Sequence, residues 1–175
     1  MNDTSGDIKF LISDTPDFPE DQVHAIARKL FGIDGDLKFL DSDRDLNFRL
    51  RNDDGTWVLK FFHPEEDAGV IDFQTHALLH IAETDPDLLV PWVTPTKRGL
   101  PFGKAKAPDG RTSIVRLLGW VPGTDLHLVP DTRNLRHSTG ALVARLDRAL
   151  QVFHHPSAIH TLVWDIKQSP ALRIH

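Results

Sequence analysis

Lys60 is the side chain in this sequence with the clearest capacity for chemistry. It lies in the run Trp-Val-Leu-Lys-Phe-Phe at residues 57–62. Successive side chains of a β-strand point to opposite faces, so Lys60 shares a face with Val58 and Phe62. An ammonium fixed between apolar neighbours on a rigid strand can hold phosphate groups without moving. A lysine that extends from a sheet edge into water has the same pattern, and the strand alone leaves both interpretations open.

The residues around Lys60 predict an antiparallel sheet. Leu46, Phe48 and Leu50 alternate with polar residues, which is typical of a half-buried strand. The turn Asn-Asp-Asp-Gly at 52–55 tolerates positive φ and predicts a hairpin with the strand of Lys60. A second hairpin is expected around Pro-Asp-Gly at 108–110. With a short strand from residue 37 and an interrupted one at 88–93, the sequence predicts about five antiparallel strands and an α+β fold.

Helices are expected before, within and after this sheet. Residues 19–31 begin with proline and two acids and are followed by Gly32, which predicts a helix. Residues 63–82 open with proline and an acidic turn and predict a second helix. Residues 134–153 predict a long third helix with an apolar side. Residues 1–17 are expected to form a poorly ordered lead-in, with a short strand at 8–12.

Composition and charge exclude several classes of function. The chain has 175 residues, 40% of them hydrophobic and 26% charged, as in an ordinary globular domain. A net charge of −5 argues against a nucleic-acid partner. No apolar run approaches the ~20 residues of a membrane span, and the first residues do not resemble a signal peptide. The absence of cysteine fits a cytoplasmic protein.

The histidines near the C-terminal end do not predict a metal site. Their spacing matches no compact ligand motif, and no carboxylate is paired with them in the sequence. The residues concerned are His154, His155, His160 and His175. A serine hydrolase is no better supported, because the sequence has no Gly-x-Ser-x-Gly elbow.

Several short motifs, taken in their order and spacing, resemble the aminoglycoside phosphotransferase superfamily, the small-molecule relatives of protein kinases. The resemblance is closer to the branch of hydroxylysine kinase and of the phosphotransferase domains fused to some bacterial aminotransferases. It extends over about residues 18–166. The motifs are Asp43-Arg-Asp-Leu-Asn-Phe48, Asp72-Phe-Gln-Thr-His-Ala-Leu-Leu-His80, Val115-Arg-Leu-Leu118 with Pro122-Gly123, and Ala144-Arg-Leu-Asp147 running on to Phe153-His-His-Pro156 and Trp164-Asp165.

The resemblance implies a kinase-like nucleotide-binding N-lobe over residues 1–122. Residues 123–175 would be the hinge and the first helices of a truncated helical C-lobe. Lys60 would hold the phosphates of ATP or GTP. Gln74 would orient Lys60, in the place where kinase-like families usually have a glutamate. Because glutamine carries no charge, it would hold the ammonium more weakly than an ion pair.

The resemblance also implies a set of cofactor-binding residues. The backbone near Gly119 and Val121 would bond the adenine edge, and Val58 would line the adenine pocket. The loop at 41–45 would lie over the phosphates, although its aspartates would repel them unless they point away. The remaining members of the implied set are Ser42, Arg44, Asn47 and Leu118.

The rest of the phosphoryl-transfer machinery is not found in the sequence. The reaction needs magnesium ligands and a base near the acceptor hydroxyl. Family members carry a His-Gly-Asp type loop, an asparagine five residues after its aspartate, and a later magnesium-binding aspartate. After Asp165, this sequence contains neither asparagine nor aspartate. We therefore assign no base and no metal ligand, and we expect this chain alone not to turn over substrate.

Two functional hypotheses follow. The first is the nucleotide-binding lobe of a kinase that phosphorylates a hydroxyl of a small amine or amino-acid-like substrate, with ATP or GTP and Mg²⁺ in the parent enzyme. The second is a non-catalytic kinase-like docking module of a larger protein. A truncated lobe would also leave the apolar sides of residues 134–165 exposed, which predicts self-association.

Overall fold

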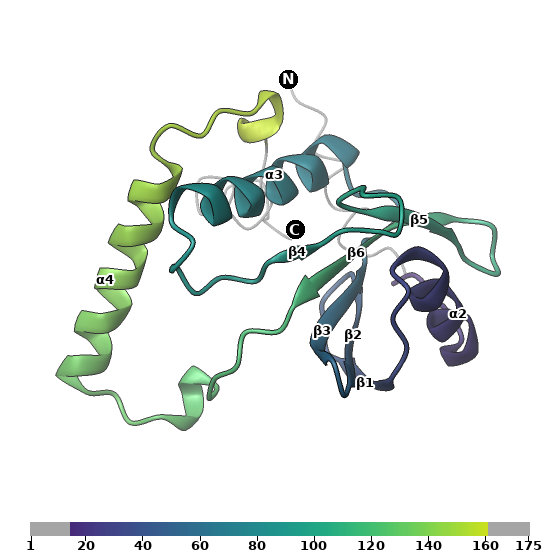
Figure 1. Ribbon diagram of the computed structural model, residues 1–175, viewed down its shortest axis with the longest axis horizontal. Coiled ribbons are helices and arrows are strands. Elements are labelled where there is room, and N and C mark those ends of the chain that lie inside the picture. Colours follow the sequence, from purple (N-terminus) through teal and green to yellow (C-terminus); the bar gives the residue numbers. More distant parts are fainter. Residues whose placement is uncertain (1–14, 161–175) are drawn as a thin grey trace, which may run out of the picture.

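The computed structural model describes residues 15–160 of the chain (Figure 1). The strand predicted at 8–12 and the Trp-Asp motif at 164–165 lie outside the described residues. So does most of the lead-in predicted over residues 1–17. At its end, however, Pro16 is fully buried, and Phe18 is 4% exposed. These two residues before α2 are therefore buried, and the predicted lead-in stays a prediction.

The centre of the fold is a six-stranded antiparallel sheet, in the order β1-β2-β3-β6-β4, with β5 also paired to β6. This confirms the predicted α+β class, with one strand more than the five expected. Since Pro91 has no N–H for a ladder, the strand predicted at 88–93 is reduced to the two residues of β4. The strands are β1 Asp36–Leu40, β2 Leu46–Asn52, β3 Gly55–Phe61, β4 Val93–Thr94, β5 Gly103–Lys106 and β6 Thr112–Gly119.

One face of the sheet forms the main core. Helix α2 (Glu20–Leu30) packs on this face through Val23, Ile26 and Ala27. Its observed bounds lie within a residue of the predicted 19–31, and acidic and basic residues occupy its first and last turns as the helix dipole favours. The strands contribute Leu46, Phe48, Leu50, Leu59, Phe61, Val115 and Leu117 to the same core.

Helix α3 (Ala68–Thr84) begins later than the sequence predicted. The predicted start at residue 63 was wrong, because His63 is still held at the end of the sheet, where its backbone N–H donates to Asp45 at 2.9 Å. The helix begins only after Asp67, whose carboxylate accepts from the Gly69 N–H at 2.6 Å as an N-cap. Figure 1 shows α3 lying across one end of the sheet.

Helix α4 (Arg133–Leu150) follows the short helix η1 (Leu126–Leu128) and is capped by Thr132. It packs against α3 through a small cluster of Ile81, Leu88 and Ala149. Figure 1 shows α4 apart from the sheet, at the end of a long irregular segment. Within residues 15–160, every helix is too short or too polar to cross a membrane.

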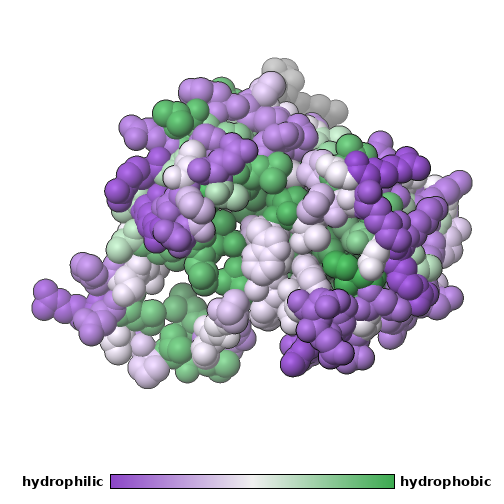
Figure 2. Space-filling model, viewed as in Figure 1, coloured by the Kyte–Doolittle hydropathy of each residue, from purple (hydrophilic) through white to green (hydrophobic). Residues whose placement is uncertain are grey.

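Apolar side chains of α4 and its surroundings remain exposed. Leu142 is 48% exposed and Val143 is 51% exposed. Leu126 and Leu128 of η1 are also exposed. Figure 2 shows hydrophobic surface gathered in the hollow between α4 and the sheet. The apolar side that the sequence predicted for this helix is therefore only partly covered by α3.

An ion pair ties α4 to the end of α3. Arg145 donates through two nitrogens to both carboxylate oxygens of Asp85, the C-cap residue of α3. The hydrogen bonds from Arg145 hold the pKa of Asp85 below its ordinary value of 3.8. The pair therefore stabilises the fold only while Asp85 is charged, because protonation removes the acceptor of the fork.

We predict that Asp85→Asn lowers stability at neutral pH and flattens its dependence on acid. The folded-state pKa of Asp85 lies below the unfolded value, so the contribution of the pair is complete above about pH 5 and is lost as the pH falls through the folded pKa. Urea unfolding of both proteins between about pH 7 and pH 3 measures this. Parallel stability curves for the two proteins would contradict it.

Candidate functional site

The face of the sheet opposite α2 carries a row of polar side chains beside a row of apolar ones. In the strand register, Asn47 lies opposite Lys60, and Lys60 lies opposite Arg116. Two residues along, Val58 lies opposite Leu118, which in turn pairs with Val93. Rows of this kind lie about 7 Å apart on one face. A cationic strip and an apolar strip therefore lie side by side on a surface that α2 does not cover.

Four of the predicted site residues lie together on this face. They are Asn47, Val58, Lys60 and Leu118, all half-buried. The carbonyl oxygen of the Asn47 side chain is buried and has no hydrogen-bond partner among the described residues. It offers an acceptor to an N–H or O–H of a ligand.

Lys60 is held by a carboxylate of the preceding loop. Its ammonium forms an ion pair with Asp45, and its Nζ lies 4.9 Å from the centre of the Phe62 ring. The side chains of Lys60 and Asp45 are each 20% exposed. Of the loop aspartates that were expected to repel phosphates, Asp45 thus points toward Lys60.

Arg116 is a functional candidate that the sequence analysis missed. It is 4% exposed, and its guanidinium lies 4.8 Å from the centre of the same Phe62 ring. Its Nη1 donates to the hydroxyl of Thr75 in α3 at 2.8 Å. Burial lowers the pKa of Arg116 to about 10, and the charge of Asp45 opposes this shift. Arg116 therefore remains a buried cation at neutral pH.

A sequence signal for Arg116 was available. In residues 115–118, Val115 and Leu117 alternate with Arg116, so a strand that buries the first two turns the arginine to the face of Lys60. The partner could not be found in this way, because Thr75 lies 41 residues away in the chain.

Gln74 does not meet Lys60 among the contacts that the structure describes. It is exposed on α3, and the residue of this helix that faces the sheet is the next one, Thr75. The ammonium of Lys60 forms its ion pair with Asp45 instead. The role of Gln74 as an orienting residue therefore rests on the family resemblance alone.

The loop residues Ser42 and Arg44 lie between β1 and β2, shortly before Asp45. The backbone N–H of Ser42 donates to Asp41 at 3.1 Å. Arg44 forms an ion pair with Glu66 over 3.2 Å, with 15% of its side chain exposed. The loop is thus tied to the segment before α3, and its expected position over the phosphates stays a prediction.

The predicted hinge leaves the sheet at Gly119. Its N–H donates to the Trp92 carbonyl at 2.8 Å, and the Trp120 N–H donates to Thr56 at 3.0 Å. Both N–H groups are therefore occupied, and the predicted role of the backbone near Gly119 and Val121 stays a prediction. Val121 also lines a cleft of about 410 Å³ together with Leu78, Leu88, Val90 and Trp92.

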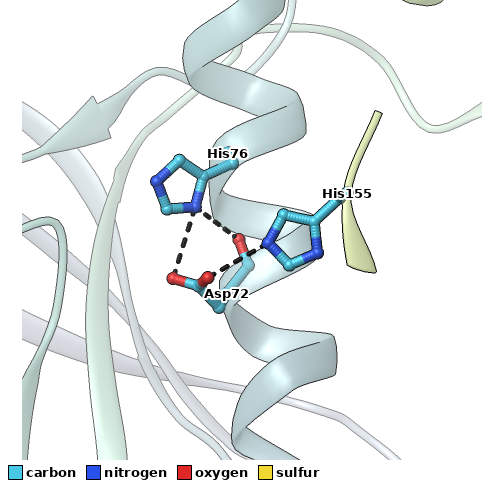
Figure 3. Close-up of side chains that lie close together, drawn as sticks. All are labelled: Asp72, His76 and His155. Atoms are coloured by element: carbon cyan, nitrogen blue, oxygen red, sulfur yellow. Dashed lines mark hydrogen bonds and ion pairs between the residues drawn. The ribbon is translucent and has the colours of Figure 1, made fainter. Parts of the chain in front are cut away.

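A second polar cluster lies on α3, away from the sheet (Figure 3). Asp72, His76 and His155 offer ligand atoms that all lie within 4.8 Å of one another. The sequence analysis found no carboxylate paired with the histidines. That was wrong, because His155 Nε2 lies 3.1 Å from Asp72, which is 83 residues away in the chain.

The hydrogen bonds of this cluster fix where its protons lie. The Ser157 N–H can only donate, so His155 Nδ1 accepts, and the neutral ring carries its proton on the Nε2 that faces Asp72. The carbonyl of Asp72 can only accept, so His76 Nδ1 carries a proton as well. Both nitrogens near Asp72 are therefore hydrogen-bond donors, and the cluster fastens the segment after α4 to α3.

The predicted absence of a metal site stays a prediction.

Two solved kinases have a fold similar to that of this chain. The amicoumacin kinase hAmiN, in a complex with AMP-PNP, Ca²⁺ and Ami, matches 86% of this chain with a TM-score of 0.63 and 14% identity, over 44% of its own chain. The microcompartment-associated aminopropanol kinase matches 82% of this chain, over 44% of its own, with a TM-score of 0.62 and 17% identity. The fold is thus that of kinase-like phosphotransferases, as the sequence predicted.

The chain belongs to the phosphotransferase enzyme family, whose model matches residues 36–172. Relatives include hydroxylysine kinase from Bos taurus, 27% identical over 173 residues that cover 90% of this chain and 46% of the relative. Hydroxylysine kinase from Mus musculus matches with the same identity and coverage. The chain spans about half the length of these curated relatives. The resemblance inferred from the short motifs is confirmed.

We predict that Gly119→Ala destabilises the protein. A Cβ at this position would lie 2.0 Å from ring atoms of Trp92, so the indole must leave the place where it covers β6. Because Trp92 is 52% exposed and can turn toward solvent, we expect a cost near the lower end of the overpacking range, about 1 kcal/mol. Urea unfolding measures the loss, with Gly123→Ala as the control, because a Cβ there would meet nothing within 4 Å. Equal stability of the two variants would contradict the prediction.

Proposed function

We propose that this chain is the nucleotide-binding part of a small-molecule kinase. The whole protein would transfer the γ-phosphate of ATP or GTP to a hydroxyl of a small amine or amino-acid-like substrate. The observation that carries the proposal is the position of Lys60. It lies on the face of the sheet opposite α2, beside an apolar row, in a chain that belongs to the phosphotransferase family.

The residues of this face fit a nucleotide. Lys60 contacts the phosphates, and the apolar strip of Val58 and Leu118 lies under the base. Asn47 supplies its unpartnered carbonyl oxygen to the sugar or to a phosphate-bound water. Ser42 and Arg44 cover the phosphates from the loop, and backbone groups near Gly119 and Val121 meet the edge of the base. Gln74 is exposed in this structure, so its side chain must adopt another rotamer before it can support Lys60.

Charge neutralisation is the chemistry that these residues supply. Phosphoryl transfer depends on positioning and on cations that balance the negative charge of the transferred group. ATP with Mg²⁺ provides the transferred group and part of this balance when bound. The base and the carboxylates that hold Mg²⁺ are not assigned to any residue of this sequence, and we expect no turnover by this chain alone.

The acceptor class follows from the names of two similar proteins. Hydroxylysine and aminopropanol each carry an amine and a hydroxyl group. A cation of this kind is attracted by acidic or aromatic groups, and the hydroxyl receives the phosphoryl group. We place such an acceptor, rather than a nucleic acid or a membrane lipid, as the partner of the whole protein, and we place the protein in the cytoplasm.

A second candidate function is a docking module without catalysis. Two observations favour it. Lys60 already has a partner in Asp45, and apolar residues of η1 and α4 remain exposed. A surface of this kind binds another protein or a second copy of the chain. In this case the ion pair of Lys60 with Asp45 only stabilises the fold, and Lys60 binds no ligand.

We predict that the chain binds Mg-ATP and that Lys60→Ala weakens this binding at least about tenfold, as expected for the loss of a charge-assisted contact to phosphate. Isothermal titration calorimetry of the 175-residue chain measures both affinities. Lys104→Ala is the matched control, because Lys104 is an exposed lysine on β5. Absence of binding to every variant would favour the docking module. Magnesium-dependent phosphate transfer by the chain alone would contradict the expectation that this chain does not turn over substrate.

A further inference from the structure

Two cations lie over the Phe62 ring, and a carboxylate is paired with one of them. Lys60 and Arg116 lie in neighbouring register positions of β3 and β6, and their cationic groups lie 4.9 and 4.8 Å from the centre of this ring. Asp45 forms the ion pair with Lys60, and its charge also acts on Arg116. Two cations and one carboxylate leave a net charge of about +1 at this place. Such a group attracts an anion even while Lys60 is paired.

Asp45 has partners besides Lys60. One of its carboxylate oxygens accepts from the His63 N–H at 2.9 Å, and the other binds Lys60. The charge of Asp45 lies close enough to Arg116 to raise the pKa of the arginine against the effect of burial. The bond from the His63 N–H keeps this carboxylate in place when the ammonium leaves it. Lys60 can therefore exchange one anionic partner for another without leaving Asp45 unpaired.

Arg116 is fixed from behind. Its Nη1 donates to Thr75, and Thr75 donates to the Ile71 carbonyl in α3, so the guanidinium is held between α3 and the sheet. Its Nε is buried and has no hydrogen-bond partner among the described residues. A side chain that is 4% exposed cannot swing toward a ligand in solvent. It acts instead as a fixed positive charge behind Asp45 and Lys60.

We propose that Asp45 competes with a phosphate-class anion for the ammonium of Lys60. Asp45 binds the ammonium in the absence of ligand and releases it when the anion binds. Arg116 holds Asp45 by its charge and keeps the site positive. The identification of this anion as a nucleotide rests on the proposed function. The competition itself rests only on the three charges. In this arrangement Asp45 and Arg116 are positioning residues, and Lys60 is the group that touches the anion.

The first test compares two carboxylates of the same loop. Asp45→Asn keeps an oxygen that can accept from the His63 N–H but removes the charge that competes for Lys60. Asp43→Asn removes an exposed charge that has no described contact with Lys60. Tripolyphosphate is the probe, titrated by calorimetry into the full chain at fixed ionic strength. We expect about tenfold tighter binding in the Asp45 variant and less than about twofold in the Asp43 variant.

The second test removes the buried cation. Arg116→Met replaces the guanidinium by an apolar chain of similar length, so Asp45 keeps Lys60 as its main partner and the site becomes neutral. We expect about tenfold weaker binding of tripolyphosphate, and a return toward the affinity of the unmodified chain when Asp45→Asn is added. Thr75→Val controls for the lost hydrogen bond, because it leaves the charge of Arg116 in place. If Arg116→Met does not fold, the comparison of the two aspartate variants decides alone.

The outcomes separate this inference from the proposed function. If the Asp45 variant binds tripolyphosphate no more tightly than the Asp43 variant, or more weakly than the unmodified chain, the competition is refuted. Absence of binding to all variants refutes it as well. If tripolyphosphate follows the expected pattern but ADP, titrated in parallel, does not bind, the anion site stands and the nucleotide function fails. If ADP binds with no difference between the two variants, the function stands and the competition fails.

Discussion

The alternation of side chains along three paired strands is the constraint on which this structure depends. Leu46, Phe48 and Leu50 of β2 face the core in register with Leu59 and Phe61 of β3 and with Leu117 of β6. Because the period is two, the residues between them must face the other way. Burial of the apolar set under α2 therefore sets the cationic and apolar rows of the opposite face, including Lys60, Arg116 and Val58. The core and the candidate site are two sides of one pattern.

The support of Lys60 differs from the arrangement that the family resemblance implied. A partner on the helix after the lysine strand was expected at Gln74, yet the helix instead contributes Thr75, which holds Arg116. The charge that pairs with Lys60 comes from Asp45, in the loop between β1 and β2. Strand β3 thus sets the position of Lys60 on the sheet. The charges around Lys60 come from Arg116 of β6 and from Asp45 in the loop before β2. A helix that fixes an arginine can influence the lysine without contacting it.

Local signals carried the sequence analysis, and contacts between distant residues limited it. The alternation of β2 and β3, the turn at residues 52–55 and the proline before α2 each act within a few residues, so the sheet and the first helix were predicted well. The start of α3 was missed because His63 is held by Asp45, which lies 18 residues earlier. The Thr75–Arg116 bond and the Asp72–His155 bond depend on how whole elements pack, which no spacing in the sequence indicates. Period two was enough to group Val58 with Lys60 on one face, but neither Arg116 nor the partners of Lys60 could be found in this way.

Methyl NMR of the full chain during titration with ADP shows whether a nucleotide lies on the face of the sheet opposite α2. Val58 and Leu118 lie on that face, whereas Leu59 and Leu117 lie on the core face of the same two strands. An aromatic base above the first pair shifts their methyl resonances strongly through its ring current and leaves the second pair nearly unchanged. We predict this difference. Equal shifts in both pairs, or shifts confined to residues of α2 or α4, would contradict a nucleotide site on this face.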